Sequence, residues 1–271
     1  MDNSSAGHAV GAPWPWEIGF QFSGSPIKAE LTQFNTILTV IISLVVLIVL
    51  GLLVFVLLRF HARHHPTPSR RTHNTPLEVI WTLIPVLILA VVAVLSLPLL
   101  FHITRIPKTE LTLKITGNQW FWSYQYPDDG GFGFDSYMID EKGLKPGQLR
   151  LLETDNHVVL PINTVIQLQI TSADVIHSWL VPSLGVQMYA VPGRLNGTWV
   201  RIDHVGIYYG QCNQICGVNH GFMPIEIEAI PKAAFAAWAA QAKKRFARTD
   251  MPKTEATLAE MPVEMNRGER Q

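Results

Sequence analysis

The chain has 271 residues, of which 48% are hydrophobic and 15% are charged, and its 21 Lys and Arg balance its 21 Asp and Glu. This composition is too apolar for a disordered chain and too neutral for a protein that binds nucleic acid through the phosphates, so both classes are excluded. The balance is uneven, because residues 59–75 carry four Arg and no acid, whereas residues 106–230 carry seven basic and twelve acidic residues.

Two uncharged, apolar runs in the first third of the chain are long enough to cross a bilayer. The 28 residues between Glu30 and Arg59 carry no formal charge, and a second uncharged run extends from residue 79 to residue 101. A transmembrane helix needs about 20 apolar residues. A buried helix of a large globular protein is the alternative, but two such lengths in one short chain disfavour it. We therefore predict a transmembrane helix hairpin over residues 31–105, after an external N-terminal segment at residues 1–30.

The loop between the two runs, at residues 59–75, determines the expected orientation. It holds four Arg and four His, and loops rich in Lys and Arg stay in the cytoplasm. Both termini are then expected on the periplasmic side of a bacterial inner membrane, with the mitochondrial inner membrane as the alternative. The four His could also bind metal, but His beside Arg in a short loop more often faces solvent and membrane lipid.

The pattern changes from continuous apolar runs to alternation after residue 106. Apolar and polar residues alternate, as in half-buried strands, in three segments: residues 111–116, 166–170 and 225–228. Gly and Pro punctuate the intervals, so an antiparallel sandwich or barrel is the natural closure of a domain at residues 106–230. In residues 231–271, apolar residues three and four apart predict an amphipathic helix, followed by a polar tail.

The most informative stretch combines two thiols, an imidazole and a thioether. Cys212, Cys216, His220 and Met223 are separated by four, four and three residues. These spacings would fit one face of a helix, but three Gly and a Pro nearby disfavour a helix. A disulfide is a second alternative, yet it would close only a short loop and leave the His and Met unexplained. We interpret the stretch as a metal site on a loop between strands.

The ligand types favour copper. Structural zinc sites are normally closed by Cys and His alone, whereas a thioether is a copper ligand. A mononuclear blue-copper site needs one Cys, two His and a weak axial Met, so this stretch has one Cys more than that site uses. Two thiolates can bridge two copper ions if a second His comes from elsewhere in the fold. Among His157, His177 and His204 we choose His177, which follows a predicted strand.

With these residues the chain resembles subunit II of haem–copper cytochrome c oxidases of the type that carries a binuclear copper centre, CuA. The resemblance rests on the motif Cys-x3-Cys-x3-His-x2-Met at residues 212–223 and on the segments at residues 175–179 and 191–196. It covers about Trp14 to Pro231. It implies a two-helix transmembrane hairpin followed by an all-β, cupredoxin-like Greek-key sandwich and a C-terminal amphipathic helix.

The resemblance also implies a role for each ligand. It makes Cys212 and Cys216 the bridging thiolates, and His177 and His220 the imidazole ligands. Met223 and the backbone carbonyl of Gln214 would be weak axial ligands. The family usually has Glu at the position of Gln214, and that Glu also reaches a magnesium ion at the boundary with subunit I. The amide of Gln214 supplies no negative charge, which puts the magnesium site in doubt. Acids common in the family are also replaced at two other positions, Gln125 and Tyr189.

A subunit of this kind is expected to accept electrons from a reduced c-type cytochrome and to pass them to haem in subunit I, where O2 is reduced to water and protons are translocated. The resemblance assigns Trp120 as the point where electrons arrive and Glu78 as the entrance of a proton channel. A core aromatic and a helix cap are the respective alternatives.

The net negative charge of residues 106–230 favours a basic donor, either cytochrome c or another small redox protein. Subunits I and III are the other expected partners, and nucleic acid is not one. Two rival functions remain, a copper-free quinol oxidase subunit and a membrane-tethered copper or thiol redox protein.

Overall fold

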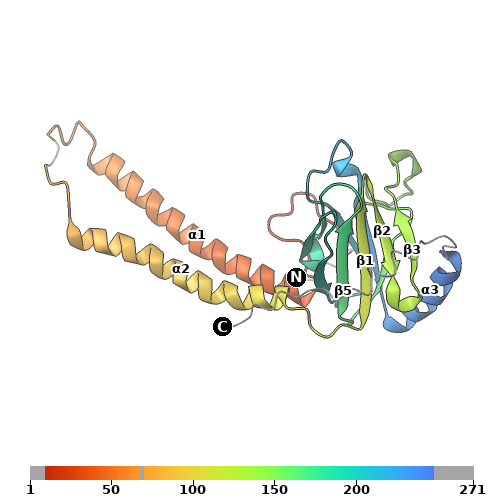
Figure 1. Cartoon of the computed structure of the whole chain (residues 1–271). Coiled ribbons are helices and arrows are strands. Elements are labelled where there is room, and N and C mark those ends of the chain that lie inside the picture. The colour runs from red at the N-terminus through yellow and green to blue at the C-terminus, as the bar shows by residue number, and fades with distance from the viewer. Residues whose placement is uncertain (1–9, 68–69, 247–271) are drawn as a thin grey trace. The chain divides into compact units, whose positions relative to one another are not determined.

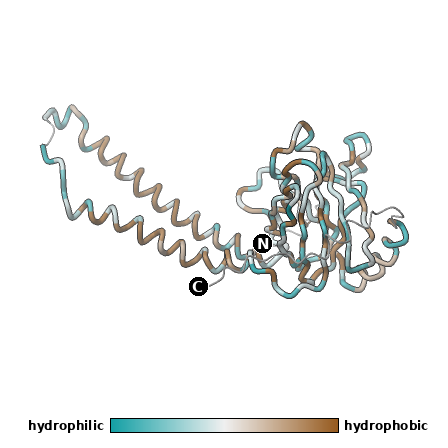
Figure 2. The backbone as a smooth tube through the Cα atoms, in the orientation of Figure 1, coloured by the Kyte–Doolittle hydropathy of each residue, from teal (hydrophilic) through white to brown (hydrophobic). Residues whose placement is uncertain are grey.

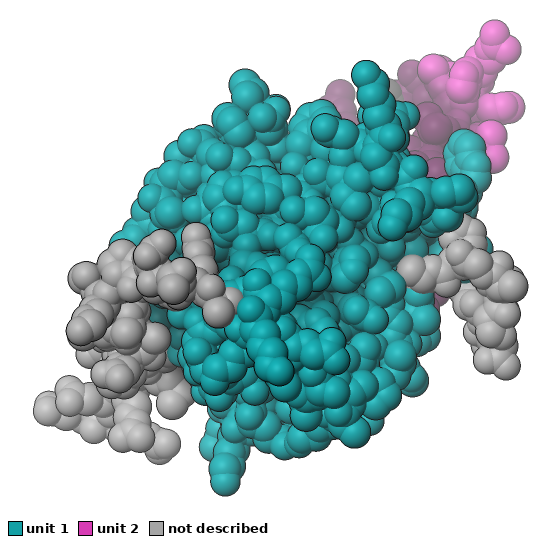
Figure 3. All heavy atoms as spheres, turned by 90° about the vertical axis from the view of Figure 1, so that its right-hand side faces the viewer, with its two compact units in different colours: residues 1–29, 103–271 teal, residues 30–102 magenta. Residues whose placement is uncertain are grey.

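The structure is a computed structural model that describes residues 10–67 and 70–246. It divides into two compact units, one of residues 30–102 and one that combines residues 1–29 with residues 103–271 (Figure 3). The predicted polar tail begins beyond residue 246 and lies outside the described residues.

Two long helices make up most of the smaller unit, and their bounds are α1, Pro26–Arg59, and α2, Thr75–Thr104. Both are apolar along most of their length (Figure 2) and are long and apolar enough to cross a membrane. Most of their Val, Leu and Ile side chains are exposed, which is unfavourable in water and favourable in lipid. Near one end of the pair, His102 Nδ1 lies 2.9 Å from Glu30 Oε2 and joins the two helices. The predicted hairpin of apolar helices is confirmed.

The larger unit is a sandwich of two five-stranded sheets (Figure 1). The first sheet has the order β3-β2-β1-β5-β8, with bounds β1, Leu111–Asn118; β2, Phe121–Tyr126; β3, Phe132–Ser136; β5, Ile166–Ser172; and β8, Asn196–Val200. The second sheet has the order β4-β10-β9-β6-β7, with bounds β4, Val158–Pro161; β6, His177–Val181; β7, Val186–Ala190; β9, Gly206–Cys212; and β10, Pro224–Ile230.

The sandwich is not purely antiparallel, which corrects one detail of the sequence prediction. β1 pairs with β5 in parallel, and β4 pairs with β10 in parallel, whereas the other strand pairs are antiparallel. Parallel partners need a crossover connection, so the chain passes between the sheets several times. All four residues of β4 are buried, and a short continuous apolar run of this kind is typical of a strand in a parallel pair.

The third helix, α3 (Lys232–Arg245), lies against the sandwich (Figure 1), and its aromatic side chains pack on aromatic residues of the first sheet. Three residues of β2, Trp122, Tyr124 and Tyr126, point inward and are almost fully buried. The ring of Trp238 on α3 meets the ring of Tyr126 at 5.3 Å between centroids. The predicted C-terminal amphipathic helix is therefore present, and it buries its apolar face against the sandwich.

The N-terminal segment before α1 also belongs to this unit. Gly11 forms a bridge with Tyr208 of β9, and the hydroxyl of Ser25 donates a 2.7 Å hydrogen bond to the carbonyl of Leu184. A side chain at Gly11 would lie 2.7 Å from the Tyr208 Cα, so only glycine allows this approach. The described part of the N-terminal segment is thereby attached to β9 and to the turn between β6 and β7.

Candidate metal centre

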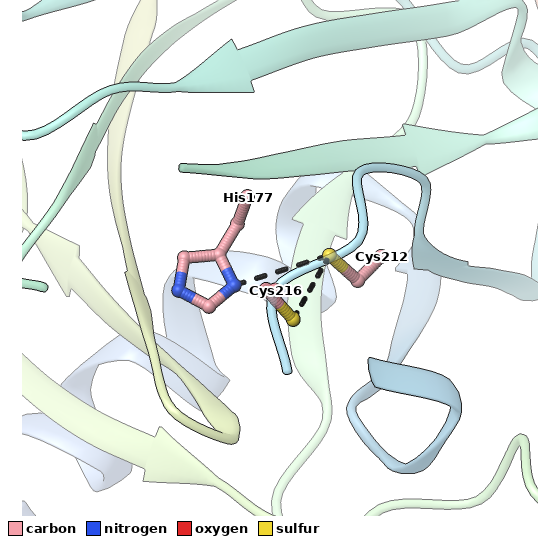
Figure 4. Close-up of side chains that lie close together, drawn as sticks. All are labelled: His177, Cys212 and Cys216. Carbon is pink, nitrogen blue, oxygen red and sulfur yellow. Dashed lines mark hydrogen bonds between the residues drawn. The ribbon is translucent and has the colours of Figure 1, made fainter. Parts of the chain in front are cut away.

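All six predicted ligand groups lie close together at one end of the second sheet, joined by contacts of 3.3–3.9 Å. His177 begins β6, and Cys212 ends β9, where it stands beside Trp179 of β6. Figure 4 shows the imidazole of His177 directed toward the two sulfur atoms. Among the His, Cys, Asp and Glu side chains of the described residues, His177, Cys212 and Cys216 form the one group of three that lies close enough together to hold a metal ion.

The contacts divide the centre into two half-sites. In the first half-site, Cys212 Sγ lies 3.9 Å from His177 Nδ1 and 3.3 Å from the Gln214 carbonyl oxygen. In the second half-site, Cys216 Sγ lies 3.6 Å from His220 Nδ1 and 3.6 Å from Met223 Sδ. Each thiol thus has its own imidazole and its own weak donor.

The separation of the two sulfur atoms fits a shared metal. Cys212 Sγ and Cys216 Sγ are 3.9 Å apart and both cysteines are free, whereas a disulfide bond is about 2.05 Å long. A metal–thiolate bond is about 2.3 Å, so one ion beside the line between the sulfurs can bond to both. Two soft thiolates with an imidazole and a thioether are donors that suit copper. The donor set present therefore fits copper.

The electrostatics of the thiol pair also favour a bound cation. Burial raises the pKa of Cys212, but contacts with His177 and with the backbone of Ser178 and Gln214 outweigh burial, and the net shift is downward. Burial and the charge of Cys212 raise the pKa of Cys216. Metal ligation needs both groups as thiolates. A bound cation would offset the repulsion between the two thiolates, so the shifts of the thiol pair fit a metal site.

Asp174 orients the first imidazole. Its Oδ1 lies 2.9 Å from His177 Nε2, and His177 is completely buried. With Nε2–H donated to this carboxylate, Nδ1 presents its lone pair toward Cys212, which is how histidine ligands are commonly held. The other oxygen of Asp174 accepts a 2.6 Å hydrogen bond from the backbone N–H of Gln119.

The β1–β2 hairpin of the opposite sheet forms the surface on which His177 rests. Gly117 and Trp122 face each other across this hairpin. A Cβ atom at Gly117 would lie 2.8 Å from Cδ2 of His177, so the imidazole packs directly on glycine backbone. The ring of Trp122 meets the imidazole edge-on, with centroids 5.9 Å apart. Sequence spacing did not reveal Gly117 as part of the site, because the contact crosses between the two sheets.

Trp120, the proposed point where electrons arrive, lies at the turn of the same hairpin. Its Cζ2 would be 2.8 Å from a Cβ atom at Gly217, so the indole packs against the loop that carries the ligands. The neighbouring side chain of Gln119 donates a 2.8 Å hydrogen bond to the Cys216 carbonyl. The turn is therefore attached to the metal loop at two adjacent residues.

Glu78 is not part of this cluster, since it lies in the first turn of α2. Its Oε1 accepts a 3.0 Å hydrogen bond from the backbone N–H of Asn74, and the Asn74 side chain accepts one from the N–H of Leu77. Glu78 and Asn74 together cap the helix N-terminus. Of the other positions singled out in the sequence, Gln214 and Gln125 are half-buried and Tyr189 is exposed.

Two apolar helices followed by a cupredoxin-like sandwich with this donor set define a membrane-anchored copper-protein fold. The family model described as cytochrome C oxidase subunit II, periplasmic domain, matches residues 111–230, and the model for the transmembrane domain of the same subunit matches residues 13–99. The probable cytochrome c oxidase subunit 2 of Rickettsia bellii is 50% identical over 232 residues, covering 86% of each chain.

A second relative supports the same family. The cytochrome c oxidase subunit 2 of Cereibacter sphaeroides is 40% identical over 252 residues, covering 86% of this chain and 83% of the relative. A crystal structure of the periplasmic domain of subunit II of cytochrome oxidase from Bradyrhizobium japonicum is 49% identical and covers 52% of this chain and 99% of its own, with a TM-score of 0.49. The chain belongs to the cytochrome c oxidase subunit II family. It is a membrane subunit of an oxidase, and the sequence-based assignments of family, fold and enzyme are confirmed.

Proposed function

We propose that this subunit receives electrons at a binuclear copper centre, CuA. The observation that carries the proposal is the pair of free thiols 3.9 Å apart, each with its own imidazole. The residues that would hold the two ions are His177, Cys212, Cys216, His220, Met223 and the backbone carbonyl of Gln214. When bound, the copper pair would accept one electron at a time from a reduced c-type cytochrome and deliver it to haem in subunit I, where O2 is reduced to water with proton translocation.

The protein's contribution is to hold the ligands in fixed positions and to exclude water from them. Cys212, Cys216, His177 and Met223 are all at most 6% exposed, so few water molecules would have to reorient when the charge of the site changes. Asp174 fixes the imidazole of His177, and the hairpin fixes it from the other side. Ligands that cannot move keep the reorganisation energy small, which favours rapid electron transfer.

Trp120 is the proposed point where electrons arrive, because its indole contacts the metal loop at Gly217. Residues 205–225 contain no Asp, Glu, Lys or Arg. Two of their apolar side chains are strongly exposed, Ile215 at 80% and Val218 at 85%. The net negative charge of residues 106–230 would attract a basic donor from a distance, and this uncharged surface would make the close contact. Reduced cytochrome c or a similar small redox protein fits both properties.

The same proposal includes a topology and a set of partners. The Arg-rich loop at residues 59–75 would lie in the cytoplasm, with the copper domain in the periplasm of a bacterial cell. Subunit I and subunit III would be its partners in the oxidase complex. Glu78 would lie at the mouth of a proton channel into subunit I, in addition to its role as a helix cap. The side-chain oxygen of Gln214 is the candidate magnesium ligand at the boundary with subunit I.

The decisive experiment uses the purified oxidase complex. We expect near-infrared absorption and a multi-line electron spin resonance spectrum of mixed-valent copper, and rapid oxygen uptake with reduced cytochrome c. A matched Cys216→Ser complex should lose both the multi-line spectrum and the oxygen uptake. Oxygen uptake with quinol but not with cytochrome c would favour the copper-free quinol oxidase. Thiol–disulfide exchange without oxygen uptake would favour the thiol redox protein, and either result would overturn the proposal.

A further inference from the structure

We propose that Trp122 is a positioning residue of the metal centre, which fixes one group of each half-site at once. This inference rests on the copper site proposed above and adds a residue that is not itself a ligand. The indole of Trp122 belongs to the first sheet. In this proposal it aligns ligands that all belong to the second sheet and its loop.

The contacts of Trp122 reach both half-sites. Its indole N–H donates a 3.2 Å hydrogen bond to the backbone carbonyl of Met223, the axial residue of the second half-site. Its ring lies edge-on to the imidazole of His177 in the first half-site, with an angle of 63° between the planes. Trp122 itself is completely buried, so it has no freedom to follow a ligand that shifts. One rigid side chain therefore connects the two half-sites.

The hydrogen bond acts on the thioether through the backbone. Met223 is 1% exposed and Pro224, which follows it, begins β10. The carbonyl of Met223 accepts from Trp122, and this contact fixes the peptide plane between the Met223 side chain and the strand. Met223 Sδ lies 3.6 Å from Cys216 Sγ, so a rotation of that peptide would change the position of the sulfur relative to the thiol. Loss of the indole N–H would also leave a buried carbonyl without this partner.

The neighbouring residues of β2 show that this role is specific to one position. Tyr124 and Tyr126 point to the same face of the strand and are also buried. The hydroxyl of Tyr126 donates to the Val159 carbonyl and accepts from the Val159 N–H. The hydroxyl of Tyr124 accepts from the indole N–H of Trp179. Neither contacts a ligand residue in these bonds, so they stabilise the core without acting on the metal centre.

The experiment compares Trp122→Phe with Tyr126→Phe in the full-length, copper-loaded oxidase. Both variants remove a buried hydrogen-bonding group from the same face of β2, so they serve as a matched pair. For Trp122→Phe we expect copper affinity, measured by competition with a chelator, to fall about 10-fold, as for other residues that orient ligands. We also expect an altered copper hyperfine pattern and a shifted reduction potential. Tyr126→Phe should lower the unfolding temperature but leave all three copper properties unchanged.

The outcomes separate this inference from the proposed function. If the wild-type protein shows no binuclear copper spectrum, the proposed function itself fails. If it does, and the spectrum, potential and copper affinity of Trp122→Phe equal those of Tyr126→Phe, the positioning role is refuted. Should Trp122→Phe not fold, replacing Trp122 with benzothienylalanine, which keeps the ring shape but exchanges the N–H for sulfur, tests the hydrogen bond alone. An unchanged copper spectrum in that variant would also refute the role.

Discussion

The substitution Gly117→Ala is the most direct steric test of how the first imidazole is held. The added methyl carbon would lie 2.8, 3.0 and 3.2 Å from Cδ2, Cγ and Cβ of His177. Carbon atoms in unstrained contact are about 3.5–4.0 Å apart, so the ring would have to withdraw by roughly 0.7 Å. Ligand constellations tolerate displacements of only about 0.5 Å. We therefore expect copper affinity to fall by about 10- to 100-fold.

A second glycine of the same sheet provides the control. A Cβ atom at Gly133 would lie 2.7 Å from the carbonyl oxygen of Tyr124, so Gly133→Ala is also overpacked, yet it contacts no ligand. Overpacking costs about 1–3 kcal/mol. The free energy of unfolding of each metal-free variant should therefore be lower than that of the wild type by an amount in this range. Copper binding and the electron spin resonance spectrum should change only in Gly117→Ala. Wild-type copper affinity and spectrum in a folded Gly117→Ala protein would refute the proposal that the backbone at Gly117 holds the His177 imidazole in position.

Three further predictions concern other parts of the chain. Met223→Leu should retain copper but shift its reduction potential in a redox titration, because only a weak donor is lost; an unchanged potential would contradict axial ligation. Glu226 is buried and pairs with His157 at 3.0 Å, which raises the pKa of His157. The stabilisation is fully present below the unfolded His pKa of about 6.5 and is lost as pH rises through the higher folded value. Glu226→Gln should therefore lower the free energy of unfolding, measured by urea denaturation, by about 2 kcal/mol in mildly acidic solution and by less in mildly alkaline solution. A difference that does not change with pH would contradict the pairing. Glu78→Gln keeps an oxygen that can accept from the Asn74 N–H but cannot release a proton. It should slow proton uptake by the assembled oxidase, measured with a pH indicator, whereas wild-type uptake would leave Glu78 as a helix cap alone.

Features encoded in a contiguous stretch of sequence were predictable. The uncharged runs identified both helices, since the bilayer requires length and apolarity that few other environments demand. The spacing from Cys212 to Met223 brought four donors within one loop, and the structure places them together. The position of His177 needed a choice among three histidines, because a ligand from a distant strand leaves no spacing signal.

Features that depend on packing between the sheets were not predictable. The contact of Gly117 with His177 joins residues 60 positions apart, and alternation along one strand carries no information on what the opposite sheet presents there. Glu226 is at one of the polar positions in the alternating pattern of its strand. It is nevertheless buried and accepts hydrogen bonds from the N–H and hydroxyl of Thr154. The irregular segment before β4 covers that face of the strand, and nothing in the pattern of β10 shows this.

The attachment of the N-terminal segment has a consequence for biosynthesis. Gly11 and Ser25 bond to residues that the ribosome adds more than 150 positions later. These early residues must therefore reach the same side of the bilayer as residues 183–208 and remain there until translation has produced their partners. The contacts of Gly11 and Ser25 can therefore form only after both helices have entered the membrane, so the attachment of the N-terminal segment comes late in the maturation of the subunit.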